Sequence, residues 1–161
     1  MTPFERALEF VLLHEGGYVW DEEDTGGETH YGISKRQYPL TDVKNLTMAQ
    51  AGEIYKRDYY DACKCGEMPE AIGFAVFDSA VNQGQGTAIR MLQTALRVKS
   101  DGFVGPQTLQ AVAAVKPADI LPKFIARRAF AYAQTPNLVR FGVGWFTRLA
   151  ECHQAAMKKE D

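Results

Sequence analysis

Apolar residues recur three and four positions apart along most of this chain, and the alternation typical of strands is nearly absent. This periodicity predicts a mostly α fold. The first helix should run from Pro3 to about Glu15, because Thr2 and Glu5 have capping-box spacing and Gly16-Gly17 follows the apolar pattern. Further helices are predicted near residues 47–61, 70–84, 86–97, 106–115, 117–134 and 145–158, with the one after Pro69 as the central core helix.

The segment after the first helix predicts loops and a small hairpin, and the other connections are short. With 161 residues, 46% of them hydrophobic, the chain can bury one substantial core. No linker, low-complexity stretch or internal repeat is visible, and one faint seam lies at 98–105. We therefore expect a single domain, 1–161, whose parts 1–98 and 99–161 share a core. The shared core is predicted to include Phe124, Phe130, Trp145 and Phe146.

Charge and cysteine content exclude several classes of function. A formal net charge of −2 gives no electrostatic reason to expect a nucleic-acid or membrane partner. Cys63, Cys65 and Cys152 are too few for a disulfide framework and lack metal-ligand spacing, so we expect buried thiols, reducing conditions, no metal and no cofactor. The first residues lack a basic leader and contain Glu5 and Glu9, so neither a signal peptide nor a membrane anchor is expected.

Glu15 stands at a helix end, among apolar residues and directly before two glycines. A carboxyl group there can be partly desolvated and held protonated, as a general acid for glycosidic cleavage requires. The position also opposes the helix macrodipole, so stability alone would disfavour it. The loop beyond supplies candidates for a second carboxylate, and Thr29 could orient a water. These acids are Asp21, Glu22, Glu23, Asp24 and Glu28. The alternative is an ordinary exposed acidic turn.

Three aromatic residues, Tyr18, Trp20 and Tyr31, lie close to Glu15 in the sequence. Sugar rings stack their apolar faces on aromatic side chains, so this cluster could form part of a glycan cleft. Packing of the loop against the core explains each of them equally well.

The stretch HEGGYVWDEEDTGGETHYGIS, residues 14–34, resembles the signature of the glycoside hydrolase family 108 muramidases, which are lysozyme-like enzymes found among phage endolysins and toxin-export proteins. The resemblance implies a lysozyme-like fold and makes Glu15 the catalytic acid. The order Glu15, Asp24, Thr29 also resembles the Glu/Asp/Thr set of phage lysozymes, with the last gap one residue shorter. It implies catalytic roles for Asp24 and Thr29.

Three further motifs extend the resemblance over nearly the whole chain. FDSAVNQG resembles the family's central helix, which implies that Asp78 and Asn82 face the cleft as substrate-binding residues. Read alone, they are an i, i+4 pair that could equally form a buried structural hydrogen bond. DGFVGPQT resembles a turn of peptidoglycan-binding regions, and RFGVGWFTRLAE resembles the closing helix, where Trp145 is expected in the core and Arg148 on a solvated face.

The resemblance implies an endolysin that hydrolyses the β-1,4 bond between N-acetylmuramic acid and N-acetylglucosamine in bacterial peptidoglycan. Such an enzyme would be made in the host cytoplasm without a signal peptide and would act in the periplasm after release by a holin, as a monomer. The alternatives are a toxin-export muramidase, a lytic transglycosylase, which can work with one glutamate, and a wall-binding module without catalysis.

Overall fold

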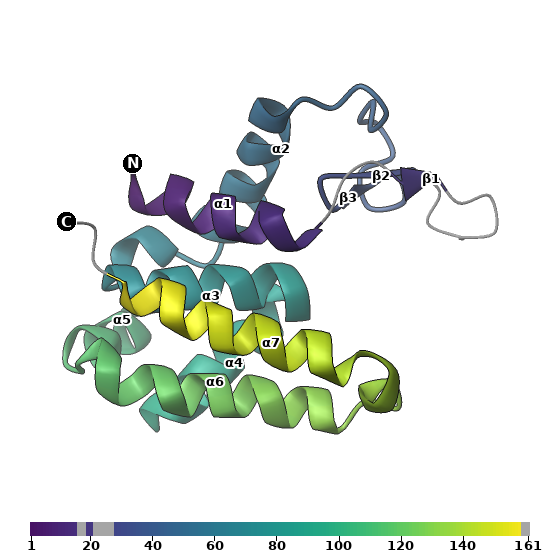
Figure 1. Cartoon of the computed structure of the whole chain (residues 1–161). Coiled ribbons are helices and arrows are strands. Elements are labelled where there is room, and N and C mark those ends of the chain that lie inside the picture. Colours follow the sequence, from purple (N-terminus) through teal and green to yellow (C-terminus); the bar gives the residue numbers. More distant parts are fainter. Residues whose placement is uncertain (16–18, 21–27, 159–161) are drawn as a thin grey trace.

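The computed structural model describes residues 1–15, 19–20 and 28–158, the side chains of Val19 and Trp20 excepted. Most of these residues lie in helices, which confirms the mostly α, lysozyme-like fold (Figure 1). The longer helices are α1 (Pro3–Glu15), α2 (Met48–Tyr55), α3 (Glu70–Gln83), α4 (Gln85–Leu96), α5 (Pro106–Ala113), α6 (Pro117–Ala133) and α7 (Leu138–Met157). A π-helical turn at Lys56–Asp61 continues α2, and a 3₁₀ turn at Cys65–Glu67 precedes α3.

The central helix is α3, as the sequence predicts. It contacts α1, α4, α6 and α7, and Figure 1 shows it between α1 on one side and α6 and α7 on the other. Its residues from Ile72 to Ala80 are all buried. Gly73 lets the helix pack on the 3₁₀ turn, because a Cβ there would lie 2.4 Å from the carbonyl oxygen of Cys65. Buried residues of this helix belong to the same hydrophobic cluster as buried residues of α1, α4 and α6.

Local signals in the sequence fix several helix starts. The hydroxyl of Thr47 accepts a hydrogen bond from the Gln50 amide at 3.2 Å, and the Gln50 side chain accepts one from the Thr47 amide at 2.9 Å. Thr2 and Glu5 form the same reciprocal pair at the start of α1. Each of these two reciprocal pairs is a capping box.

The expected small hairpin is a three-stranded antiparallel sheet in the order β1-β2-β3, near the C-terminal end of α1 (Figure 1). Its strands are β1 (Val19–Trp20), β2 (Glu28–His30) and β3 (Ile33–Ser34). Thr29 pairs with Val19 on one side and Ser34 on the other. The turn between β2 and β3 holds Tyr31 and Gly32 at φ 51° and 75°, as a tight two-residue hairpin requires.

The last helix and part of the predicted core differ from expectation. Helix α7 begins at Leu138 instead of near residue 145. Its first turns carry exposed apolar residues, including Val139 and Val143, so no one-sided apolar stripe marks them in the sequence. Phe124 is fully buried and Trp145 partly buried, but Phe130 and Phe146 are 61% and 43% exposed and do not belong to the core.

The three cysteines are free and buried. Burial raises the pKa of Cys63 to about 11 and also raises the pKa of the Cys65 and Cys152 thiols. Among the residues that the structure describes, no three His, Cys, Asp or Glu side chains gather as metal ligands. Within the same residues, no helix is long and apolar enough to cross a membrane.

Candidate active site

Glu15 is the last residue of α1, and its carboxylate is bound by Arg148 of α7. Arg148 Nη1 donates to Glu15 Oε1 at 2.9 Å. The Glu15 side chain is 22% exposed and the Arg148 side chain 8%, so the pair lies at the edge of the core with the acid toward solvent. The acid is therefore held in place by an arginine 133 residues away in the sequence.

Arg148 also binds Asp78 of α3, which is buried between two guanidinium groups. Arg148 Nε donates to Asp78 Oδ1 at 2.9 Å, and Arg148 Nη2 lies 2.8 Å from the same oxygen. Arg128 Nη2 of α6 lies 2.7 Å from Asp78 Oδ2. The two Nη2 contacts are ion pairs that lack hydrogen-bond geometry. The expectation that Arg148 lies on a solvated face is wrong, because the buried charge of Asp78 needs a cation beside it.

We call Glu15, Arg148, Asp78 and Arg128 the charge network. Burial alone would raise the pKa of Asp78, but the guanidinium groups of Arg128 and Arg148 outweigh it and hold this pKa below its ordinary value. Arg128 is fully buried, and its Nε donates to Gln83 Oε1 at 2.8 Å. The sequence left two roles open for Asp78, contact with substrate and a buried structural interaction. Its environment in the structure is that of a buried structural residue.

Asn82, one turn after Asp78, belongs to a separate contact. Its side-chain oxygen accepts a hydrogen bond from the hydroxyl of Tyr132, whose ring stacks on Trp145 with centroids 4.8 Å apart. Asn82 is partly buried, and none of its hydrogen bonds goes to Asp78 within the described chain. An amide and two stacked rings therefore lie side by side, one helical turn along α3 from the charge network.

The β2–β3 turn packs directly against Glu15. A Cβ at Gly32 would lie 3.0 Å from both Cβ and Oε2 of Glu15 and 2.5 Å from the Tyr55 hydroxyl. That hydroxyl donates to the Tyr31 carbonyl at 2.8 Å and so fixes the turn to α2. Burial first, and the charge of Glu15 next, raise the pKa of Tyr55, which stays a neutral donor. The turn therefore closes on the oxygen of Glu15 that Arg148 does not bind.

Two family models match the chain in succession. The model of glycosyl hydrolase 108 matches residues 8–84, and the model of a predicted peptidoglycan domain matches residues 87–150. The two matches give a glycosyl hydrolase 108 domain and a peptidoglycan domain in that order along the chain. We call these segments the hydrolase region and the peptidoglycan region; they meet between α3 and α4. Together they make the protein a glycoside hydrolase that acts on peptidoglycan.

A solved structure has a similar fold over nearly the whole chain. The structure of Brucella abortus SagA is similar over 96% of this chain and 93% of that chain, at 29% sequence identity and a TM-score of 0.85. Among curated proteins, none matches the sequence.

Not every residue that the sequence singles out can be placed. Asp24 and Tyr18 lie outside the described residues, and of Trp20 only the backbone is described, in β1. Thr29 sits in the middle of β2 and is partly buried, and no hydrogen bond joins it to Glu15. Tyr31 lies in the turn beside Glu15, with its ring stacked on His30 at 4.1 Å.

Sequence reasoning missed Arg128, Tyr55 and the position of Arg148 beside the acid. Arg128 and Tyr55 carry no motif, and each belongs to a helix whose apolar pattern explains the neighbouring residues without them. A fully buried arginine is rare, so composition gives no reason to expect one.

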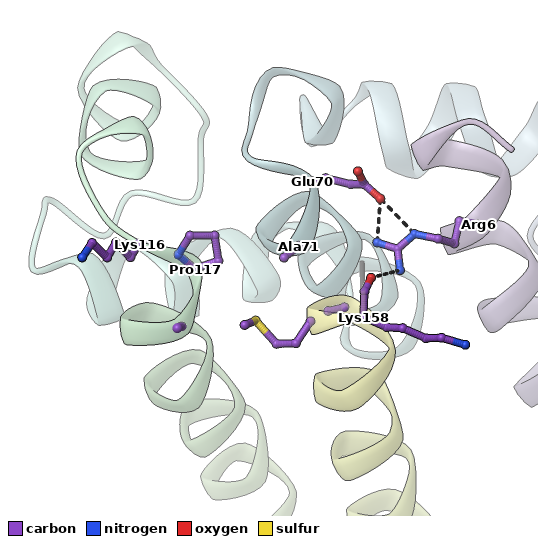
Figure 2. A pocket seen from close by; sticks show the side chains of 9 residues that line it. Arg6, Glu70, Ala71, Lys116, Pro117 and Lys158 are labelled. Atoms are coloured by element: carbon purple, nitrogen blue, oxygen red, sulfur yellow. Dashed lines mark hydrogen bonds and ion pairs between the residues drawn. The ribbon is translucent and has the colours of Figure 1, made fainter. Parts of the chain in front are cut away.

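A separate pocket of about 480 Å³ lies near the start of α1 and the end of α7. Figure 2 shows Arg6 there, with Nε and Nη2 at 2.9 and 2.7 Å from Glu70 Oε1. Arg6 Nη1 also donates to the carbonyl oxygens of Ala155 and Lys158 at 2.7 and 3.5 Å. Arg6 thereby satisfies carbonyls at the end of α7 and fixes α1 against it, far along the helix from Glu15.

Proposed function

We propose that this protein is an N-acetylmuramidase of the endolysin type, which hydrolyses the β-1,4 bond between N-acetylmuramic acid and N-acetylglucosamine with Glu15 as general acid. The observation that supports it is a carboxyl group at the end of α1, held by Arg148 on one oxygen and faced by a glycine turn on the other. A fixed acid beside a small residue can approach a glycosidic oxygen closely.

In this mechanism Glu15 donates its proton to the departing sugar oxygen. Asp24 stabilises the oxocarbenium-like transition state or activates the attacking water, and Thr29 orients that water. Tyr18, Trp20 and Tyr31 offer ring faces to the sugars, and Asn82 offers an amide. Asp78 acts on the site through Arg148, because its own side chain is fully buried.

Product analysis tests the proposal. Purified peptidoglycan is digested, reduced with borohydride and examined by mass spectrometry. Hydrolysis at muramic acid adds one water and leaves reducible muramic ends. We expect those ends from the wild type, and a decrease of at least about 100-fold in Glu15→Gln, which keeps the size of the side chain but loses the proton. Glu9→Gln, an exposed glutamate on the same helix, is the matched control and should keep full activity.

Each alternative gives a different product. Anhydro ends, lighter by one water and resistant to reduction, would replace the hydrolase with a lytic transglycosylase. Reducible glucosamine ends would move the cut to the other glycosidic bond. No fragments at all would leave a wall-binding module.

The endolysin role rests on the resemblance of residues 14–34 to phage endolysins. Bacteria that express the protein in the cytoplasm should stay intact until a holin or chloroform opens the inner membrane, and should then lyse within minutes. Release of folded toxin without lysis in the same assay would instead favour the toxin-export role.

A further inference from the structure

The guanidinium group of Arg148 has all three nitrogens engaged by acids of the hydrolase region. Nε and Nη2 meet Asp78 Oδ1 at 2.9 and 2.8 Å, and Nη1 donates to Glu15 Oε1 at 2.9 Å. A planar group held at three points cannot rotate away from Glu15 without breaking a buried ion pair. The orientation of Arg148 is therefore set by Asp78 and not by Glu15 alone.

Charges alternate along the network. Arg148 and Arg128 are positive and Asp78 is negative, and the four groups sum to zero when Glu15 is ionised, before it takes up the proton that it transfers. Arg128 and Asp78 are fully buried, Arg148 is nearly so, and only Glu15 opens to solvent. Since a buried charge without a partner is strongly disfavoured, each inner member keeps its neighbour in place. Only the outermost member is positioned to meet a ligand.

The two cations come from the peptidoglycan region, and the two acids come from the hydrolase region. We propose that Arg148 is a positioning residue for Glu15, so that the peptidoglycan region completes the hydrolytic site in addition to any part it takes in binding the wall. This inference rests on the proposed function, in which Glu15 is the general acid.

The geometry also assigns the proton. Arg148 donates to Oε1, so the proton that Glu15 transfers sits on Oε2. Oε2 faces the turn at Gly32, where a Cβ would stand 3.0 Å away. Arg148 thus selects which oxygen of Glu15 carries the proton, and the glycine keeps a side chain from contacting that oxygen. A side chain that keeps the charge but cannot bind both acids would lose this selection.

Steady-state kinetics of the full chain on soluble, uncross-linked glycan strands test the proposal. The variants are Arg148→Lys, which keeps the charge, and Arg148→Met, which removes it, with the exposed Arg127→Met as matched control. We expect Arg148→Lys to fold and to lose about 10-fold or more in kcat, because the acid is misplaced, while KM changes by less than about twofold. The control should match the wild type in both constants.

The pH profile gives a second readout that a purely structural arginine would not move. Described groups around Glu15 are Tyr55 of α2, Asp78 of α3, Arg128 of α6, Arg148 of α7 and the adjacent His14–Glu151 pair. Arg148→Met removes the positive charge nearest to the acid, so the dependence of kcat on pH should change in this variant. It should match the wild type in Arg148→Lys and Arg127→Met.

Other outcomes overturn the proposal. A raised KM with unchanged kcat in Arg148→Lys would make Arg148 a substrate contact. Unchanged kcat and KM, or an Arg148→Lys protein that does not fold despite its retained charge, would make the network structural only. The proposed function fails separately, because in that case the wild type itself yields no reducible muramic ends.

Discussion

Gly32 is the residue that sets how closely the β2–β3 turn approaches the acid. Its φ of 75° is a conformation that side chains with a Cβ adopt at a cost, and the added atom would meet both the Tyr55 hydroxyl and Glu15. Conformation and space therefore both require glycine here.

We expect Gly32→Ala to lower the free energy of unfolding by about 1–3 kcal/mol and to reduce turnover more than that loss explains, because the turn must move off Glu15 Oε2. Gly144→Ala on α7 is the control, because no atom lies within 4 Å of a Cβ added there. This substitution should stabilise the helix slightly. Urea unfolding and kcat at a temperature where both variants are folded provide the measurements. Wild-type kcat in folded Gly32→Ala would show that the contact does not affect catalysis.

At the scale of elements, α1 is fixed to α7 at two places. Arg6 binds carbonyls at the end of α7, and at the other end of α1 two neighbouring residues reach the same helix: His14 Nε2 lies 2.9 Å from Glu151 Oε2, and Glu15 binds Arg148. Asp78 of α3 binds Arg148 and so stabilises the contact between α1 and α7. The position of the acid therefore depends on the packing of three helices.

Asp78→Asn should be strongly destabilising, because it leaves Arg128 buried without the carboxylate it pairs with and leaves Arg148 with Glu15 alone. We expect a loss of about 3–5 kcal/mol in the free energy of unfolding, measured with urea at neutral pH. Asp61→Asn removes an acid from an exposed pair with Lys56, about half exposed on both sides, and should cost less than about 1 kcal/mol. Equal effects of the two substitutions would show that the buried network contributes no more than a surface pair.

The same substitution has a pH signature. The folded-state pKa of Asp78 is depressed, so its contribution to stability is fully present above the unfolded value of about 3.9 and is lost as pH falls through the folded value. The difference in the free energy of unfolding between wild type and Asp78→Asn should therefore be constant between roughly pH 5 and 7, which lies above both the folded and the unfolded pKa of Asp78. It should shrink below about pH 4. A stability difference that increases as the pH falls would contradict a depressed pKa for Asp78.

At the scale of the whole molecule, removal of everything after Val98 should unfold the protein. The deletion takes away Leu121, Phe124 and both arginines of the charge network, which leaves Asp78 buried and unpaired in α3. Circular dichroism should show no cooperative melting for residues 1–98, and the fragment should not lyse permeabilised cells. A soluble, active fragment that melts cooperatively would establish two independent domains.

The parts that could be predicted from the sequence have local causes. Thr47 and Gln50 are three residues apart and form their capping box, and Gly16-Gly17 follows the last residue of α1. Arg148 could not be placed this way, because the acid that it binds lies 133 residues earlier and no spacing rule connects them. The start of α7 was hidden for a related reason: its exposed Val139 and Val143 give no stripe for periodicity to detect.

The buried thiols offer a way to time the opening of each half of the protein. Cys63 and Cys65 lie in the hydrolase region, whereas Cys152 lies on α7, where its sulfur accepts from Arg128 Nη1 at 3.5 Å. Only the thiolate reacts with an alkylating reagent, and burial suppresses it at all three positions, so labelling under native conditions requires an opening motion. If the charge network makes one cooperative unit, mass spectrometry of peptides should show the three cysteines labelling at one common rate. Faster labelling of Cys152 alone would mean that α7 separates from the core while the hydrolase region stays folded. The hydrogen bond from Arg148 to Glu15 would then break each time α7 separates.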